Sequence, residues 1–260
     1  MKANSYVRAK SLDEAYSLLN ENPLNKILGG GLWLKKGNAQ IETLIDLADL
    51  GLDKVEDKGD FVEVGSLVSL RELELNPLIK GIAHGLISNA AGKVMGPAFR
   101  NIATIGGTIV GRFAFSDVLT ALLIKDVTLV FYKGGEVSLE EFLSSFNPVK
   151  DILVKVKISK CECKSFFKKC VITSLDYPLV NIAVTKGPHG YRIAVGSRPA
   201  VASLAKEAME YLSKGGDDFE KAAELAVSSL KFGDSTAIKA DYRKQLVKTY
   251  VRRGLKEVNQ

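Results

Sequence analysis

Two glycine clusters are the parts of this sequence best suited to binding chemistry. Gly29–Gly31 follows the short apolar run Lys26–Leu28, and Gly106-Gly107 interrupts an apolar, β-branched stretch between Arg100 and Asp117. Glycine lets a backbone or ligand approach closely, and it also permits the positive φ of a bulge or turn. Successive free N–H groups at such a place would cradle an anion, above all a phosphate. Gly106-Gly107 alone favours a bulge, whereas two cradles together indicate a diphosphate.

No pairing of a nucleophile with a base stands out. His84 lies in an apolar helical pattern and His189 at the tip of an expected hairpin, so both are interpreted as structural. Neither glycine cluster is a Rossmann fingerprint, because Gly106-Gly107 lacks G-x-G-x-x-G spacing and no long helix follows Gly29–Gly31. A bound cofactor would then carry the chemistry, with the protein supplying binding, orientation and electrostatics.

Five motifs occur in an order typical of one protein family. They are Leu28–Trp33 (for A-G-G-T-D-L), Arg100–Thr108 (for R-N-x-x-T-I-G-G-N), Ser116-Asp117, Tyr177–Val180, and Tyr242-Arg243 to Leu246 with Arg252-Arg253. With these motifs the chain resembles, nearly end to end, the FAD-binding medium subunit of the molybdenum hydroxylases. This family includes the xanthine dehydrogenase, carbon monoxide dehydrogenase and aldehyde oxidoreductase types.

The resemblance implies an α+β fold. Residues 1–159 would form a two-lobed FAD-binding domain of the vanillyl-alcohol oxidase (PCMH) type, with lobes of about 1–60 and 61–159. Residues 160–260 would form an α+β C-terminal domain, an antiparallel sheet plus helices.

The resemblance also implies the residues that bind FAD, and no catalytic or metal-ligating residue is among them. Asp117 would bond to the polar tail of the flavin, although an acidic residue here is equally expected as the N-cap of the next helix. Trp33 is a flavin contact or a core aromatic. The expected FAD-binding residues are Leu28, Gly29, Gly30, Gly31, Leu32, Trp33, Thr104, Ile105, Gly106, Gly107, Thr108, Ser116, Asp117, Leu153 and Lys168.

The implied activity is that of an oxidoreductase subunit that carries electrons. Electrons would pass from a molybdopterin-binding large subunit through the 2Fe-2S clusters of a small subunit to this FAD, and then to an outside acceptor. Two alternatives stay open: a stand-alone flavin reductase, which the C-terminal Tyr-Arg motif disfavours, and a flavin-free scaffold subunit. The scaffold is kept open by departures from the family, in which Leu32 replaces a polar residue, Thr108 replaces Asn, and Gly111–Phe115 replaces a small, polar run.

Composition limits the partners and the compartment. The net charge of +6 is spread along the chain, so no nucleic-acid partner is expected. No apolar run approaches the roughly 20 residues of a membrane span, and the N-terminus lacks a signal-peptide pattern, so a cytoplasmic protein without a membrane partner is expected. Three cysteines, Cys161, Cys163 and Cys170, lack a fourth ligand for an iron–sulfur or zinc site.

The elements that must position these residues follow from periodicity and capping. Ser-x-x-Glu boxes begin helices at Ser11, Ser69 and Ser138. Apolar spacing predicts one helix from Leu78 to Gly92, and the second glycine cluster otherwise reads as strand. Other expected strands are 26–28, 42–47, 61–67, 127–131, 152–158, 166–172, 179–185 and 191–195; other expected helices are 32–36, 118–124, 201–214, 218–230 and 241–258.

Overall fold

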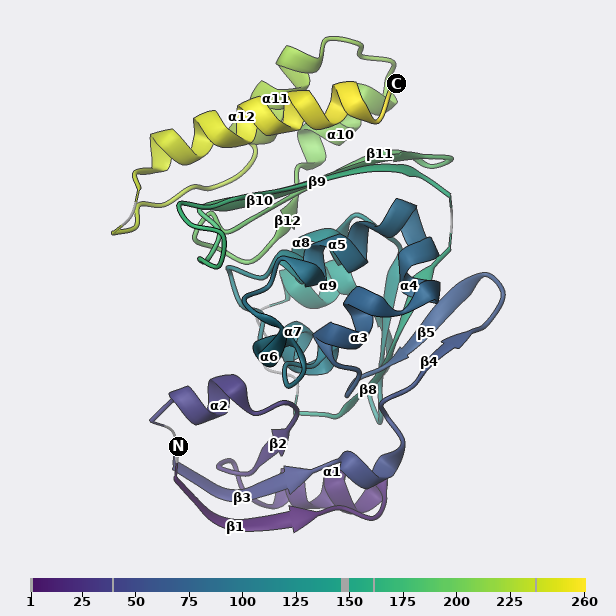
Figure 1. Ribbon diagram of the computed structural model, residues 1–260, viewed down its shortest axis with the longest axis vertical. Helices are drawn as coiled ribbons and strands as arrows, with labels where there is room; N and C mark the ends of the chain where they lie inside the picture. The colour runs from purple at the N-terminus through teal and green to yellow at the C-terminus, as the bar shows by residue number, and fades with distance from the viewer. Residues whose placement is uncertain (1, 39, 146–149, 161, 237) are drawn as a thin grey trace.

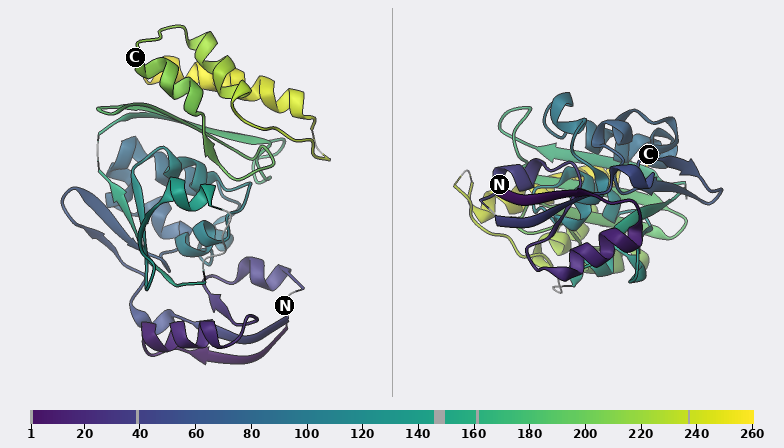
Figure 2. Two further views of the ribbon diagram at one scale, coloured as in Figure 1. Left: turned by 180° about the vertical axis from the view of Figure 1, so that it is seen from behind. Right: turned by 90° about the horizontal axis from the view of Figure 1, so that it is seen from below.

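The computed structural model describes residues 2–38, 40–145, 150–160, 162–236 and 238–260. Three sheets follow one another along the long axis of the molecule, in the order of the sequence (Figure 1). The same order is clear from behind (Figure 2). No helix in these ranges is long and apolar enough to cross a membrane.

The first sheet is parallel and has the strand order β1-β3-β2. The Ser11 capping box is confirmed: Glu14 N–H donates to Ser11 Oγ over 3.1 Å, and Lys10 N–H donates to the Glu14 carboxylate over 2.7 Å. Strand β1 was not expected, because nearly all its side chains are exposed and no apolar alternation marks it. The elements are β1 (Lys2–Arg8), α1 (Leu12–Glu21), β2 (Lys26–Leu28), α2 (Leu32–Lys36), β3 (Gln40–Asp46) and the 3-10 helix η1 (Ala48–Leu50).

The second sheet is antiparallel, with the order β4-β5-β8-β6-β7. Between β5 and β6 the chain forms a group of short helices that lies between this sheet and the third (Figure 1). The capping boxes at Ser69 and Ser138 are confirmed. The strands are β4 (Val55–Asp57), β5 (Phe61–Gly65), β6 (Val127–Phe131), β7 (Gly135–Ser138) and β8 (Leu153–Ser159). The helices are α3 (Leu70–Leu75), α4 (Pro77–Gly81), η2 (Ile82–Gly85), α5 (Leu86–Gly92), α6 (Pro97–Arg100), α7 (Ile105–Val110), α8 (Asp117–Leu123) and α9 (Leu139–Ser144).

Two expectations for this region are wrong. The single helix from Leu78 to Gly92 is broken, because Ala83, His84 and Gly85 all have positive φ. The stretch around Gly106-Gly107 is not strand: it is helix α7, with Thr104 as its N-cap. Thr104 Oγ1 accepts from Gly107 N–H over 3.1 Å, and this cap outweighs the β preference of the isoleucines.

The third sheet is antiparallel, has the order β12-β11-β10-β9, and is buried on both faces. On β10, Ile182 and Val184 pack toward the C-terminal helices, while Ala183 packs toward the core under α5 and α8. Because side chains alternate between two covered faces, β10 is almost wholly buried. The elements are β9 (Lys164–Cys170), β10 (Val180–Gly187), β11 (Gly190–Gly196), β12 (Ser203–Leu204), α10 (Lys206–Ser213), α11 (Phe219–Ser228) and α12 (Ala240–Glu257).

Candidate cofactor site

A cavity of about 730 Å³ lies between the first sheet, the short helices, the start of β8 and the end of β9. This volume falls within the roughly 300–1,000 Å³ typical of ligand sites. Its lining is mostly apolar, with polar groups at a few positions. Of the expected FAD-binding residues, those that line it are Gly29, Gly30, Gly31, Leu32, Trp33, Thr104, Gly106, Gly107, Thr108, Ser116, Asp117 and Leu153.

The first glycine loop joins β2 to α2 and presents unused donors. Gly31 is the N-cap of α2 and has a φ of 72°, which favours glycine. Within the described ranges, the backbone N–H groups from Gly29 to Trp33 have no hydrogen-bond acceptor. Successive free N–H groups of this kind form a concave donor surface for an anion.

The second glycine pair differs, because its N–H groups are already bonded inside the protein. Ile105 N–H donates to Val68 O over 2.9 Å, Gly106 N–H to Ser66 O over 2.8 Å, and Thr108 N–H to Thr104 O over 3.0 Å. With the bond from Gly107 N–H to Thr104, every N–H from Ile105 to Thr108 is used. The expectation that the segment from Thr104 to Thr108 offers free donors to a diphosphate is therefore wrong for the four residues after Thr104.

Instead, the glycines of both clusters allow backbones to touch. A Cβ on Gly30 would lie 1.8 Å from the carbonyl oxygen of Ile102, and one on Gly106 would lie 2.6 Å from that of Ser66. Real Cβ atoms never come so close to a backbone oxygen. Gly30 thereby lets the first loop pack directly against the segment before α7. Gly106 lets α7 pack against the residue that follows β5.

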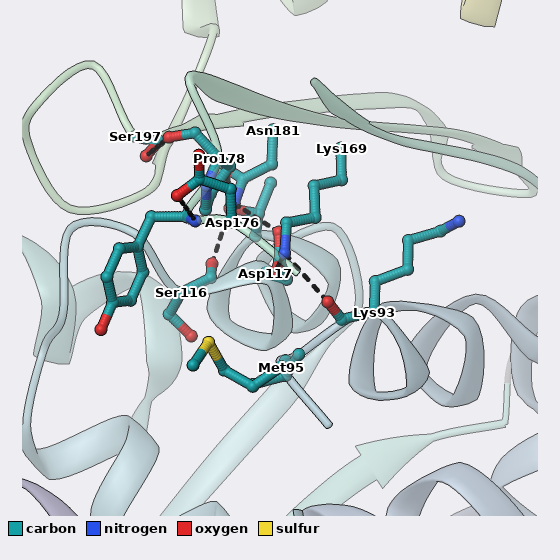
Figure 3. Close-up of polar contacts among 12 residues, drawn as sticks. Lys93, Met95, Ser116, Asp117, Lys169, Asp176, Pro178, Asn181 and Ser197 are labelled. Carbon is teal, nitrogen blue, oxygen red and sulfur yellow. Dashed lines mark hydrogen bonds and ion pairs between the residues drawn. The ribbon is translucent and has the colours of Figure 1, made fainter. Parts of the chain in front are cut away.

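Asp117 is the buried charge of the site. Its carboxylate lies 3.2 Å from Lys169 Nζ and accepts a hydrogen bond of 3.1 Å from Asn181 Nδ2. Figure 3 shows these side chains converging from α8, β9 and β10. Burial raises the pKa of Asp117 to about 6, although the Lys169 ammonium and the Asn181 hydrogen bond both act to lower it. The N-cap of α8 is Ser116, whose Oγ accepts from Leu119 N–H, so Asp117 is the first helical residue and its carboxylate is not used as a cap.

Three expected residues do not line the cavity. Lys168 lies on the opposite face of β9, with its ammonium 5.1 Å from the Tyr250 ring. Because side chains alternate along a strand, the neighbouring Lys169 faces the cavity instead. Ile105 is fully buried in the core beneath α7, and the Leu28 side chain packs against Gly31.

An aromatic wall, consisting of Trp33, Phe113, Phe115 and Tyr177, closes one part of the cavity. Trp33 lies with its ring centroid 5.0 Å from that of Phe113 and 5.2 Å from that of Phe115. Tyr177 packs on Phe115 at 4.7 Å. Trp33 lies in α2, whereas the other rings come from the loops before α8 and β10. Phe113 and Phe115, from the run Gly111–Phe115, thus join separate parts of the chain.

The C-terminal Tyr-Arg motif supports this wall from behind. Arg243 is buried and donates to the carbonyl oxygens of Leu179 and Ser197, the latter over 2.7 Å. Ser197 in turn donates through Oγ to Pro178 O over 2.7 Å and through N–H to Ala114 O over 2.9 Å. Helix α12 is therefore tied to both loops that carry the aromatic rings.

The described residues show no metal centre. No three or more of their His, Cys, Asp and Glu side chains gather in a way that could hold a metal ion. Burial raises the pKa of the Cys170 thiol to about 11, which makes it a poor metal ligand. Cys161 lies outside the described residues.

The residues that line the cavity are chemically suited to FAD. Free backbone donors face a place suited to an anion, aromatic rings offer a surface for a flat ring, and one buried hydroxyl of the lining, Ser66 Oγ, has no partner among the described residues. The sequence does not single out Ser66 or Lys169, because each looks like an ordinary polar residue of an expected strand.

Comparison with known proteins places the chain in a family. Residues 2–160 match the family model described as the FAD binding domain in molybdopterin dehydrogenase. The xanthine dehydrogenase FAD-binding subunit of Escherichia coli O157:H7 is 32% identical over 133 residues, which are 48% of this chain and 44% of that protein, so this chain matches less than half of its length. The glyceraldehyde dehydrogenase medium chain of Sulfolobus acidocaldarius is 25% identical over 98% of both chains.

Solved structures share the fold. A carbon monoxide dehydrogenase chain from Hydrogenophaga pseudoflava superposes with a TM-score of 0.88 and 22% identity, over 99% of this chain and 97% of that one. A quinoline 2-oxidoreductase chain from Pseudomonas putida 86 gives 0.87 and 23%, over 99% and 98%. The α+β fold class and the resemblance drawn from the motifs are thereby confirmed. The chain belongs to the family of FAD-binding domains of the molybdopterin dehydrogenases, whose cofactor is FAD.

Proposed function

We propose that this chain is the FAD-binding, electron-transferring subunit of a molybdenum-containing hydroxylase complex. The observation that carries the proposal is the cavity, in which unused backbone donors, a buried ion pair and an aromatic wall surround one space. Bound FAD would supply the redox chemistry, taking electrons from the iron–sulfur clusters of a partner and releasing them to an outside acceptor.

In this proposal the two glycine segments have different roles. The N–H groups from Gly29 to Trp33 bind the FAD diphosphate, because its negative charges need oriented donors when they are buried. Thr104 to Thr108 shape the opposite wall through close packing. Leu153 contributes an apolar contact from β8.

The buried cluster of Asp117, Lys169 and Asn181 binds the polar tail of the flavin. Asp117 accepts hydrogen bonds from FAD hydroxyl groups, and Lys169, in place of Lys168, holds the Asp117 carboxylate in position. Asn181 fixes the other carboxylate oxygen, and its own side-chain oxygen accepts from Thr120 over 2.7 Å. Ser116 begins the helix that carries Asp117.

The division of the chain follows from the same proposal. Residues 1–159 act as the FAD-binding domain, and residues 160–260 act as a C-terminal domain that supports the aromatic wall through Arg243. The proposed partners are a large molybdopterin-binding subunit and a small 2Fe-2S subunit. An assembly of several subunits is supported by the names of two relatives, one called a subunit and the other a medium chain.

The partners can be tested by isolating the native complex. An affinity tag on this chain in its source organism should co-purify two further chains, together with molybdopterin, iron, sulfide and FAD in defined ratios. A chain that purifies alone with FAD and reduces an acceptor would replace the proposal with a stand-alone flavin reductase. Partners without FAD would replace it with a scaffold subunit.

A further inference from the structure

Ser66 has a buried hydroxyl that the fold leaves without a partner. The residue is 4% exposed, and its Oγ makes no hydrogen bond within the described ranges. Leaving a buried hydroxyl unpaired costs free energy, so such groups call for an explanation. Ser66 is also one of the residues that line the cavity.

The backbone of Ser66 is fixed on both sides. Its N–H donates to Val154 O over 3.0 Å, and its carbonyl oxygen accepts from Gly106 N–H over 2.8 Å. The residue is thus held between β8 and the first turn of α7. The Ser66 hydroxyl can rotate about its Cβ–Oγ bond, but it has no hydrogen-bond partner among the residues that the structure describes.

The other serine and threonine hydroxyl groups that line the cavity are paired. Thr104 Oγ1 accepts from Gly107 N–H, Thr108 Oγ1 donates to Thr104 O over 2.8 Å, and Ser116 Oγ accepts from Leu119 N–H. Ser66 therefore differs from its neighbours in having its hydrogen-bonding capacity unused.

The position of Ser66 indicates which part of FAD it meets. Ser66 touches Gly106, and a Cβ on the facing Gly29 would lie 3.8 Å from Gly107 Cα. Gly106 and Gly107 therefore separate Ser66 from the first glycine loop. The free N–H groups of that loop are where the polar middle of a dinucleotide would be bound.

We infer that Ser66 is an FAD-binding residue, whose hydroxyl donates a hydrogen bond to an oxygen of the ribityl–diphosphate section. This inference rests on the proposed function. It gives the buried Ser66 hydroxyl a hydrogen-bond partner that the described residues do not supply.

Ser229 provides a matched control. It follows α11, its Oγ is also buried without a partner, and it does not line the cavity. Substitution to alanine removes the same group at both positions, so any difference in FAD binding comes from location.

The experiment is calorimetric titration of the purified full chain with FAD, alongside thermal unfolding without FAD. Ser66→Ala should raise the Kd for FAD about 2- to 12-fold, the range of one ordinary hydrogen bond, and should leave the Tm of the FAD-free protein equal or higher. Ser229→Ala should leave the Kd unchanged. Ser66→Cys, which keeps the shape but donates weakly, should fall between wild type and Ser66→Ala.

The inference is overturned if Ser66→Ala binds FAD with the wild-type Kd, or if it lowers the Tm of the FAD-free protein, since the hydroxyl would then have a structural partner. If the wild-type chain takes up no FAD, either alone or in the native complex, the proposed function fails and the inference fails with it. The first two results leave the proposed function intact, so the failures are distinct.

Discussion

Lys169 Nζ lies 3.2 Å from a carboxylate oxygen of Asp117, and both side chains are almost completely buried. The two residues come from a strand and a helix that are far apart in sequence. Lys169 also donates to the carbonyl oxygen of Lys93 over 2.9 Å (Figure 3). This ion pair joins the C-terminal sheet to the cavity wall.

The raised pKa of Asp117 predicts a pH-dependent stability. Between pH of about 3.9, where an unfolded Asp titrates, and about 6, the folded protein binds a proton that the unfolded chain has lost. The free energy of unfolding of the FAD-free wild type, relative to Asp117→Asn, should therefore fall as pH rises through this window and stay constant above it. Urea unfolding of both proteins at several pH values measures this; a difference that rises with pH would contradict the raised pKa.

The register of β9 predicts unequal roles for two adjacent lysines. Lys169→Met leaves the Asp117 charge buried and unpaired, and should cost about 3–5 kcal/mol of stability near pH 7. Lys168→Met removes a half-buried cation–π contact and should cost no more than about 1 kcal/mol. Urea unfolding compares them. Equal losses of stability would show that Lys169 does not stabilise the buried Asp117 carboxylate.

The backbone contact at Gly30 predicts a steric effect on the fold and on binding. Gly30→Ala places a Cβ 1.8 Å from Ile102 O, so the first loop must move away, at a cost of about 1–3 kcal/mol and with loss of FAD binding. Gly81→Ala is the control, because Gly81 is helical with no atom near its would-be Cβ, and this change should be neutral or stabilising. A Gly30→Ala protein with normal stability and FAD affinity would disprove the close contact.

Trp33 is the only tryptophan of the chain and lines the cavity, so it reports directly on occupancy. FAD bound against the aromatic wall should quench most of the tryptophan emission, with a midpoint equal to the calorimetric Kd. Trp33→Phe, which keeps an aromatic ring, should bind FAD while losing the signal. Unchanged emission at saturating FAD would place the cofactor away from this wall.

Local signals in the sequence predicted most elements correctly. The Ser-x-x-Glu boxes located three helix starts because that motif satisfies N–H groups within four residues. Gly106-Gly107 was misread as strand because the cap at Thr104, together with acceptors on Ser66 and Val68, decides its conformation through tertiary contacts.

The sequence indicates the cavity lining best where the lining residues are adjacent in the chain. The loop from Gly29 to Trp33 and the pair Ser116-Asp117 line the cavity, and their roles in FAD binding stay predictions. Lys169 lines the cavity and the expected Lys168 does not, because adjacent residues of a strand point to opposite faces. Ser66 could not be found from sequence, since an unpaired hydroxyl becomes visible only once every neighbouring acceptor has a position.

The most direct test of the account is whether the purified chain retains FAD. The chain is mixed with excess FAD, separated from free cofactor by gel filtration, and its visible spectrum is recorded, with the released molecule identified by mass. The account predicts the spectrum of an oxidised flavin and one FAD per chain. A colourless chain, obtained both alone and from the native complex, would contradict it.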